Sequence, residues 1–277
     1  MIFLIGGRKK ALEAASIIFA AGYGSRIKNF SGNKTILPLK PGPNLLEGEY
    51  PIIGEIIRNL PRGPKALVVH HKRDEVIKAT CDMGIFYYDQ TVPDGTGGAL
   101  IAARDFLERS DQKYLIITMG DTPFVREVTY RRLINQLGDK DLVVLGFKPR
   151  DKGQYGILEI EDDVVKRIHE WRYWKEYPIE MQNSFEISNS GIYAVRRSLA
   201  LEYLDKLKQM PHQVEKERNG QMIIVEEYFV TDLVELISND GHGVGFVIAG
   251  EEDEVMGIDT IEDLIFAQGL FAQMRRQ

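Results

Sequence analysis

The chain has 277 residues, of which 44% are hydrophobic, so it can bury a substantial core and fold unaided. Its 35 Lys and Arg residues are outnumbered by 41 Asp and Glu residues, which argues against a nucleic-acid binder with a broad basic face. A single cysteine, Cys81, excludes an intrachain disulfide, suits a reducing cytoplasm and is expected to be a small buried hydrophobe. No stretch approaches the roughly 20 apolar residues that cross a bilayer. We therefore expect a cytoplasmic protein without membrane contact.

Short apolar runs alternate with polar helical segments in the first half of the chain, a pattern typical of buried parallel strands joined by helices. Such alternation predicts a layered α/β sheet whose ligands bind beyond the carboxyl ends of the strands. The segment 40–48, rich in Pro and Gly, is expected to be a surface loop. In chain order we expect strand 16–19, helix 52–59, strand 66–70, strand 85–88, helix 98–109, strand 114–119, helix 129–137 and strand 142–147.

The second half of the chain predicts an antiparallel extension. Segments 156–161 and 164–169 flank a pair of aspartates and are expected to form a hairpin, and 191–195 is a further strand. Thr260 and Asp263 have the spacing of a capping box, which predicts the start of a terminal helix. No long linker interrupts the sequence, so residues 1–277 are expected to form one domain.

A glycine-punctuated loop follows the first strand and carries a cation. Gly22 and Gly24 allow backbone N–H groups to converge on phosphate oxygens, and Arg26 adds a permanently charged donor. A dinucleotide-binding fingerprint would need a glycine at position 27, where this chain has Ile27. A Walker loop would need Gly-Lys-Ser/Thr, which is absent. Lys34, before Leu37-Pro38, places a second cation near this loop. An ordinary strand-to-loop turn with a solvated lysine remains the simpler alternative.

With Ala20-Ala21-Gly22-x-Gly24-Ser25-Arg26 and Lys34-x-x-Leu37-Pro38, the sequence resembles the sugar-1-phosphate nucleotidyltransferases, above all the uridylyltransferase domain of the bifunctional N-acetylglucosamine-1-phosphate uridylyltransferases. Landmarks recur in the same order over about residues 15–268. The resemblance implies the Rossmann-like three-layer α/β/α nucleotide-diphospho-sugar transferase fold, with a mixed, mostly parallel sheet and an antiparallel extension on the sugar side. Residues 1–277 contain no hexapeptide repeat, so we expect no counterpart of the acetyltransferase part of those enzymes within them.

The resemblance also implies roles for individual residues. Arg26, Lys34 and Asp121 would be catalytic, and Asp121 and Asp259 would hold Mg²⁺. The nucleotide would contact Ala20, Ala21, Gly22, Gly24, Ser25, Gln90, Gly95, Thr96 and Gly120, and the sugar would contact Gly156, Glu170, Asn189 and Thr231.

Several positions depart from the family pattern. Asp259 stands where the uridylyltransferases usually have Asn, Asn33 replaces Pro, Gly98 replaces a common His and Phe229 replaces a Tyr. An aromatic insertion, 171–174, either packs on the sugar-side lobe or stacks on the acceptor. The five histidines show no metal-ligand spacing and are expected to be structural.

These residue types suit a displacement at the α-phosphorus of a nucleoside triphosphate. A sugar phosphate is largely dianionic at neutral pH, so it needs no general base, and the site must instead offset repulsion between two polyanions. Magnesium prefers one or two carboxylates together with substrate phosphates. The expected partners are thus a nucleoside triphosphate and a sugar-1-phosphate, and a homo-oligomer is left open.

Three other functions remain open from the sequence. A cytidylyltransferase acting on a phosphorylated sugar or alcohol is the nearest, because a flipped Gln90 amide could serve either pyrimidine. A non-catalytic regulatory protein that binds nucleotide sugars is the second. The third is a glycosyltransferase, which would typically carry Asp-x-Asp where this chain has Gly120-Asp121-Thr122.

Overall fold

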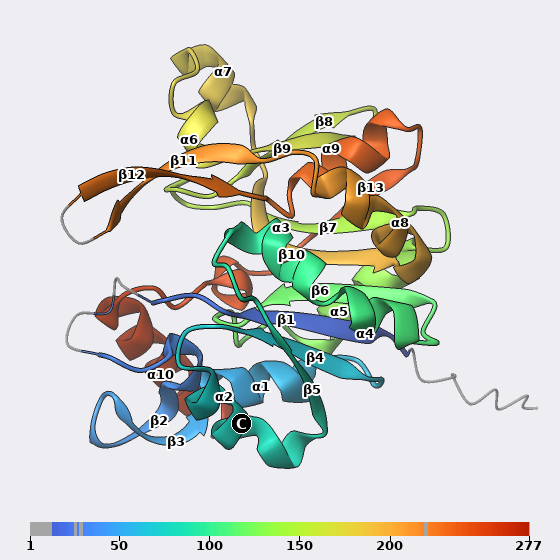
Figure 1. Cartoon of the computed structure of the whole chain (residues 1–277). Coiled ribbons are helices and arrows are strands. Elements are labelled where there is room, and N and C mark those ends of the chain that lie inside the picture. The colour runs from blue at the N-terminus through green and yellow to red at the C-terminus, as the bar shows by residue number, and fades with distance from the viewer. Residues whose placement is uncertain (1–12, 25–26, 28–29, 219–220, 277) are drawn as a thin grey trace, which may run out of the picture.

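The computed structural model describes residues 13–24, 27, 30–218 and 221–276. Within these residues one nine-stranded sheet forms the centre of the molecule, and seven strands follow the order β13-β7-β10-β6-β1-β4-β5 (Figure 1). Every pairing along this path is parallel except those of β10, so the mixed, mostly parallel sheet is confirmed. The seven strands are β1 (Ala15–Ala20), β4 (Lys65–Val69), β5 (Ile85–Asp89), β6 (Tyr114–Met119), β7 (Leu142–Phe147), β10 (Ser188–Arg196) and β13 (Val244–Ile248).

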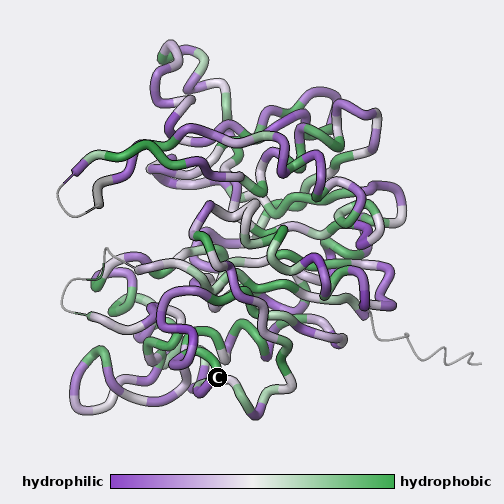
Figure 2. Tube along the Cα trace, in the orientation of Figure 1, coloured by the Kyte–Doolittle hydropathy of each residue, from purple (hydrophilic) through white to green (hydrophobic). Residues whose placement is uncertain are grey.

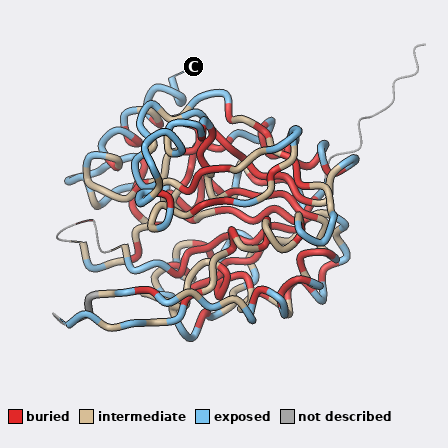
Figure 3. Tube along the Cα trace, turned by 90° about the horizontal axis from the view of Figure 1, so that it is seen from above, coloured by how far each residue is buried: buried red, intermediate tan, exposed pale blue. Residues whose placement is uncertain are grey.

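Helices cover both faces of this sheet because its strands are apolar on both sides. Ile18 and Ala20 of β1 belong to one core, and Ile17 and Phe19 belong to the other. Figure 2 shows the hydrophobic strands, and Figure 3 shows that the buried residues follow them between the outer layers. The first core includes residues of α1 (Ile52–Asn59), α2 (Arg73–Thr80), α5 (Glu127–Gln136) and α10 (Ile261–Met274), and the second includes residues of α3 (Gly95–Ala102), α4 (Arg104–Arg109), α8 (Arg197–Leu207) and α9 (Asp232–Asn239). The three-layer α/β/α fold is thereby confirmed.

The element predicted as one helix over 98–109 is two helices in the structure. Helix α3 begins three residues earlier than expected, at Gly95, and ends at Ala102. The N–H of Ala103 bonds the carbonyl of Leu100 at 3.1 Å, an i to i−3 bond that tightens the turn before α4.

Three further expectations need correction. Segment 40–48 lies at the surface as expected, but it is part of a β-hairpin of β2 (Pro38–Asn44) and β3 (Glu47–Pro51) rather than an irregular loop. The two backbones pass so closely that a Cβ at Gly48 would lie 2.1 Å from the carbonyl oxygen of Lys40. The strand around 191–195 is β10, which lies within the main sheet between β6 and β7. Cys81 is exposed, because it starts the short 3₁₀ helix η2 (Cys81–Met83) at the surface.

The predicted antiparallel extension consists of β8 (Ile157–Glu161) and β9 (Val164–His169). Asp162 and Asp163 join them with φ of 48° and 59°, as a tight hairpin turn of two left-handed residues requires. A separate two-stranded ribbon of β11 (His212–Arg218) and β12 (Gln221–Glu227) projects on the same side of the molecule as the β2–β3 hairpin (Figure 1).

The terminal helix α10 begins as the sequence predicts. Thr260 accepts from the N–H of Asp263 at 3.1 Å, and Asp263 accepts from the N–H of Thr260 at 2.8 Å, which completes the capping box. Across the described part of the chain, no helix combines the length and the apolarity that a lipid bilayer demands.

Candidate functional site

Lys34 lies between two carboxylates that are far apart in the sequence. Its Nζ is 2.5 Å from Oδ2 of Asp121 and 2.6 Å from Oδ1 of Asp259. Lys34 opens the 3₁₀ helix η1 (Lys34–Ile36), Asp121 follows β6, and Asp259 immediately precedes the cap of α10. The fold therefore brings together at Lys34 the two acidic residues that the sequence paired at one cation.

Backbone hydrogen bonds hold both acidic segments in place. The N–H of Ile258 donates to the carbonyl of Asp121 at 3.0 Å, and the N–H of Asp259 donates to the capping carboxylate of Asp263 at 3.0 Å. Burial alone would lower the pKa of Lys34, but the two neighbouring carboxylates outweigh it and raise the pKa above its usual value. Lys34 thus stays a cation.

The geometry of this pair fits a divalent ion. Both carboxylates converge on one positive atom, the Nζ of Lys34, so a metal cation between them could be bound by both. Oxygen ligands from two carboxylates, completed by water and phosphate, are what Mg²⁺ prefers. Among the described residues no group of three or more His, Cys, Asp or Glu could hold a metal ion, so substrate oxygens would have to complete the coordination.

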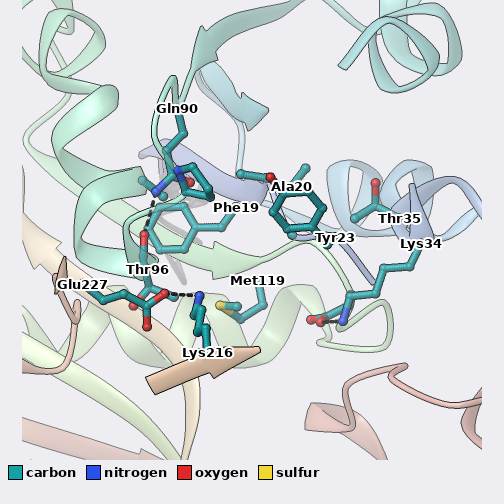
Figure 4. A pocket seen from close by; sticks show the side chains of 16 residues that line it. Phe19, Ala20, Tyr23, Lys34, Thr35, Gln90, Thr96, Met119, Lys216 and Glu227 are labelled. Atoms are coloured by element: carbon teal, nitrogen blue, oxygen red, sulfur yellow. Dashed lines mark hydrogen bonds and ion pairs between the residues drawn. The ribbon is translucent and has the colours of Figure 1, made fainter. Parts of the chain in front are cut away.

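A cavity of about 350 Å³ extends from Lys34 and Asp121 along the carboxyl ends of β1 and β6. In Figure 4, Gln90 and Thr96 lie on one side of it and Lys34 on the other. Its lining includes six residues from the sequence-derived nucleotide set, namely Ala20, Ala21, Gly22, Gln90, Gly95 and Thr96. The start of the glycine loop predicted to bind phosphates and the residue predicted to contact the base, Gln90, therefore line one cavity.

The glycine loop is described up to Gly24, and Ser25 and Arg26 lie outside the described residues. Gly24 has φ of 61°, in the left-handed region, and a Cβ there would lie 3.1 Å from Cβ of Lys34. Asn33, the departure from Pro, is fully buried, and its Nδ2 donates to the carbonyls of Ala20 (3.0 Å) and His71 (2.8 Å). Its Oδ1 accepts from the N–H of Thr35 at 3.0 Å. Asn33 thereby ties the lysine turn to the end of β1.

The loop before α3 is bonded to the segment after β12. Tyr228 donates from its N–H to the carbonyl of Asp94 at 2.8 Å and accepts from the N–H of Gly97 at 2.7 Å. Gly95 has φ of 91°, and a Cβ there would lie 2.5 Å from the carbonyl oxygen of Tyr228, so only glycine fits. Gly120 is similarly confined, because its Cβ would lie 2.6 Å from the carbonyl oxygen of Phe19.

The four residues predicted to contact the sugar form two hydrogen-bonded pairs, Thr231 with Glu170 and Asn189 with Gly156. Thr231 donates its hydroxyl hydrogen to Oε1 of Glu170 at 2.7 Å. Asn189 donates to the hydroxyl of Tyr193 at 2.8 Å and accepts from the N–H of Gly191 at 3.1 Å, while its own N–H donates to the carbonyl of Gly156 at 2.8 Å. Among the residues described, none of the four predicted sugar contacts lines the cavity above. Burial raises the pKa of Glu170, and the Thr231 hydrogen bond offsets part of that shift.

The aromatic insertion forms the short helix α6 (Trp171–Trp174). Trp174 is buried beside Ile157 and Phe185, and its indole N–H donates to the carbonyl of Tyr155 at 2.8 Å. Phe229, the departure from Tyr, stacks on His212 with 4.3 Å between ring centroids and 19° between planes. Trp174 therefore packs on the sugar-side lobe, which is one of the two roles expected for the insertion.

The sequence analysis did not identify the cavity residues Lys216 and Glu227 as site residues, nor Asn33 and Asp94 close to the cavity. Lys216 lies on β11, its Nζ donates to the Glu227 carboxylate, and both side chains line the cavity (Figure 4). A lone lysine on a polar strand carries no signal in the sequence. The register of the ribbon, which opposes Lys216 with Ile223 and His212 with Glu227, decides which face meets the cavity.

A glycine turn after β1, the lysine that opens η1 and two aspartates that converge on it lie together in this α/β fold, and comparison with known proteins shows that the fold belongs to a class of nucleotidyltransferases. The chain belongs to the family described as the MobA-like NTP transferase domain, which matches residues 16–218. The predicted likeness to sugar nucleotidyltransferases is confirmed by relatives called bifunctional protein GlmU. The one from Wolbachia sp. subsp. Brugia malayi (strain TRS) is 30% identical over 267 residues, covering 94% of this chain and 58% of that protein.

A second such relative, from Thermodesulfovibrio yellowstonii, is 31% identical over 260 residues and covers 91% of this chain and 50% of its own length. The chain thus spans about half the length of the curated relatives it matches. Among solved structures, a uridine diphosphate N-acetylglucosamine pyrophosphorylase from Trypanosoma brucei superposes with a TM-score of 0.70 at 14% identity, covering 92% of this chain and 64% of that one. A putative glucose-1-phosphate thymidylyltransferase from Bacillus anthracis gives 0.65 at 18% identity, with 93% and 95% coverage. These likenesses confirm the fold.

Proposed function

We propose that this chain is a magnesium-dependent nucleotidyltransferase that joins UTP or dTTP to a sugar-1-phosphate, such as N-acetylglucosamine-1-phosphate or glucose-1-phosphate, and releases pyrophosphate. The observation that carries the proposal is the meeting of Asp121 and Asp259 at the Lys34 ammonium, at one end of a cavity whose other end holds Gln90. Structures of the same fold that are named a uridine diphosphate N-acetylglucosamine pyrophosphorylase and a putative glucose-1-phosphate thymidylyltransferase support the same substrate class.

In the proposed reaction an oxygen of the sugar phosphate bonds to the α-phosphorus while the bond from that phosphorus to the bridging oxygen of pyrophosphate breaks. The attacking phosphate is already ionised, so no side chain has to remove a proton. Mg²⁺ held by Asp121 and Asp259 would supply positive charge to the phosphates. Lys34 would release a carboxylate to bind a phosphate oxygen, and Arg26 would add a second cation. The narrow glycine loop would offer backbone N–H donors.

On the acceptor side, Glu170 and Thr231 form the pair best suited to a sugar. One carboxylate oxygen of Glu170 accepts from Thr231, so the other is available to accept from a sugar hydroxyl. Asn189 is already oriented by Gly191 and Tyr193, which would fix the groups that it presents.

The test is a matrix of five nucleoside triphosphates against a panel of sugar phosphates, with pyrophosphate release as the measurement. We expect release with UTP or dTTP, dependence on added Mg²⁺ and abolition by a chelator. A protein that releases no pyrophosphate with any pair, yet is folded, would instead be a nucleotide-sugar-binding regulator. Transfer of a sugar from a nucleotide sugar without pyrophosphate would favour a glycosyltransferase.

A cytidylyltransferase remains the second candidate because a CMP:2-keto-3-deoxy-manno-octonic acid synthetase has the same fold, with a TM-score of 0.60 at 16% identity. It differs from the leading proposal in the base, and its acceptor can be a different sugar or an alcohol. The same matrix decides between them through the ratio of UTP to CTP turnover.

A further inference from the structure

The amide of Gln90 is held by two acceptors at the predicted base end of the cavity. Its Nε2 lies 2.8 Å from Oδ1 of Asp94 and 2.8 Å from the carbonyl oxygen of Gly95. Gln90 is 5% exposed and lines the cavity, so its side chain has little freedom to turn (Figure 4).

These two bonds use both hydrogens of the amide nitrogen. A glutamine side chain has two N–H donors and one carbonyl acceptor. A carboxylate has no hydrogen to donate, and neither has the carbonyl of Gly95, so turning the amide over would place an oxygen against two oxygens. What Gln90 can then offer a ligand is its carbonyl oxygen, as an acceptor.

The two pyrimidine classes differ at the ring nitrogen that such an acceptor would meet. Uracil and thymine carry a hydrogen on N3, whereas the N3 of cytosine is an acceptor itself. With the base placed so that N3 faces Oε1 of Gln90, uracil gains a hydrogen bond and cytosine places two lone pairs together.

We propose that Asp94 is a specificity-determining positioning residue, which fixes the Gln90 amide so that the site takes uracil or thymine nucleotides in preference to cytosine nucleotides. This inference rests on the proposed function and deepens it by naming a residue that sets the choice of base. Asp94 acts through Gln90 rather than by touching the nucleotide.

Gly98 makes room for this arrangement. A Cβ at Gly98 would lie 1.8 Å from Oδ1 of Asp94, so any larger residue pushes the carboxylate away. The family pattern usually has His at this position, and the structure gives a physical reason for its absence here. Gly98 and Asp94 therefore act together to position Gln90, although neither residue alone indicates this role in the sequence.

The experiment measures kcat/KM and dissociation constants for UTP and CTP in four variants. Asp94→Asn can present an N–H donor to Gln90, so it removes one of the two acceptors that oppose a turned amide and weakens the preference for one amide orientation. Gly98→Ala displaces the carboxylate without changing its chemistry. We expect each to lower the ratio of UTP to CTP preference by about tenfold, the worth of one buried hydrogen bond. Asp89→Asn and Gly269→Ala are matched controls, because Asp89 pairs with Arg73 instead, and a Cβ at Gly269 meets no atom within 4 Å.

Each outcome bears on one claim. A folded wild-type protein that prefers CTP, or an unchanged ratio in both Asp94→Asn and Gly98→Ala, overturns the role of Asp94. Absence of pyrophosphate release with every substrate pair overturns the proposed function, while the ratio of UTP to CTP binding constants still tests Asp94. A selective loss of UTP binding in both variants, with both controls unchanged, supports it.

Discussion

Glu254 and Asp259 lie only five residues apart in the sequence, but their carboxylates are held in opposite ways. Glu254, in the 3₁₀ helix η3 (Glu252–Val255), is 5% exposed and receives donors from the Arg126 N–H, the Arg126 guanidinium and the Thr129 hydroxyl at the start of α5. Asp259, four residues after η3, and Asp121 meet at the ammonium of Lys34. A carboxylate saturated by fixed donors stabilises the fold, whereas carboxylates that share one lysine can exchange it for another cation.

The largest effect is expected from Asp121→Ala. If Asp121 binds the metal and phosphates, turnover should fall by about 10²–10³-fold, the usual loss for a charge-stabilising group. The urea unfolding midpoint should hardly move, because the Lys34 ammonium keeps Asp259 as its partner. Asp253→Ala, a change at a nearby acid paired with Arg150, is the control. Near-normal turnover in Asp121→Ala would remove Asp121 from the mechanism.

Glu254→Ala should show the reverse pattern. Loss of three charge-assisted donors should lower the free energy of unfolding by about 3 kcal/mol, while the activity per folded molecule persists. Burial raises the pKa of Glu254, but its hydrogen bonds outweigh burial and hold the pKa below its usual value. The stabilisation is thus present above the ordinary carboxyl pKa and is lost as pH falls through the lowered one. The measurement is the free energy of unfolding by urea at several acidic pH values, for the wild type and for Glu254→Gln. If that free energy falls equally with pH in both proteins, Glu254 does not supply the pH-dependent stabilisation.

A smaller, pH-dependent effect is expected at Glu170. Burial raises its pKa and nearby Asp232 adds to the shift, whereas Thr231, Arg172 and His212 oppose it. Glu170 therefore becomes protonated at a higher pH than an ordinary glutamate. The protonated carboxyl is neutral and is a weaker hydrogen-bond acceptor for a sugar hydroxyl. The KM for the sugar phosphate should rise on mild acidification in the wild type, and Glu170→Gln should have a high KM with less pH dependence. Identical pH profiles for the two would separate Glu170 from sugar binding.

The smallest effect should come from Thr260→Ala, which removes the N-cap of α10. Such a change costs about 1 kcal/mol of unfolding free energy. Because Asp263 of the same capping box also bonds the N–H of Asp259, a loss of metal affinity should accompany the loss of stability. Titration with Mn²⁺ and thermal unfolding measure the two quantities, and unchanged metal binding would show that the cap does not position Asp259.

The sequence by itself determined the parallel half of the fold. Strands β1, β4, β5, β6 and β7 are apolar on both faces, so each stands out from the polar segments between them. Hairpin β8–β9 and the cap of α10 were likewise readable, because local chemistry at Asp162, Asp163, Thr260 and Asp263 decides them. It also determined the candidate residues at the strand ends, although their roles remain predictions.

Tertiary structure decided what depends on partners distant in the chain. The place of β10 in the main sheet follows from pairing with β6 and β7, not from its own residues. The common site of Lys34, Asp121 and Asp259 forms only when η1, β6 and the start of α10 come together. Asp94 can bond Gln90 in this position only because residue 98 has no Cβ. The physical reason is that periodicity and capping act within a few residues, whereas hydrogen-bond partners across the sheet are set by packing.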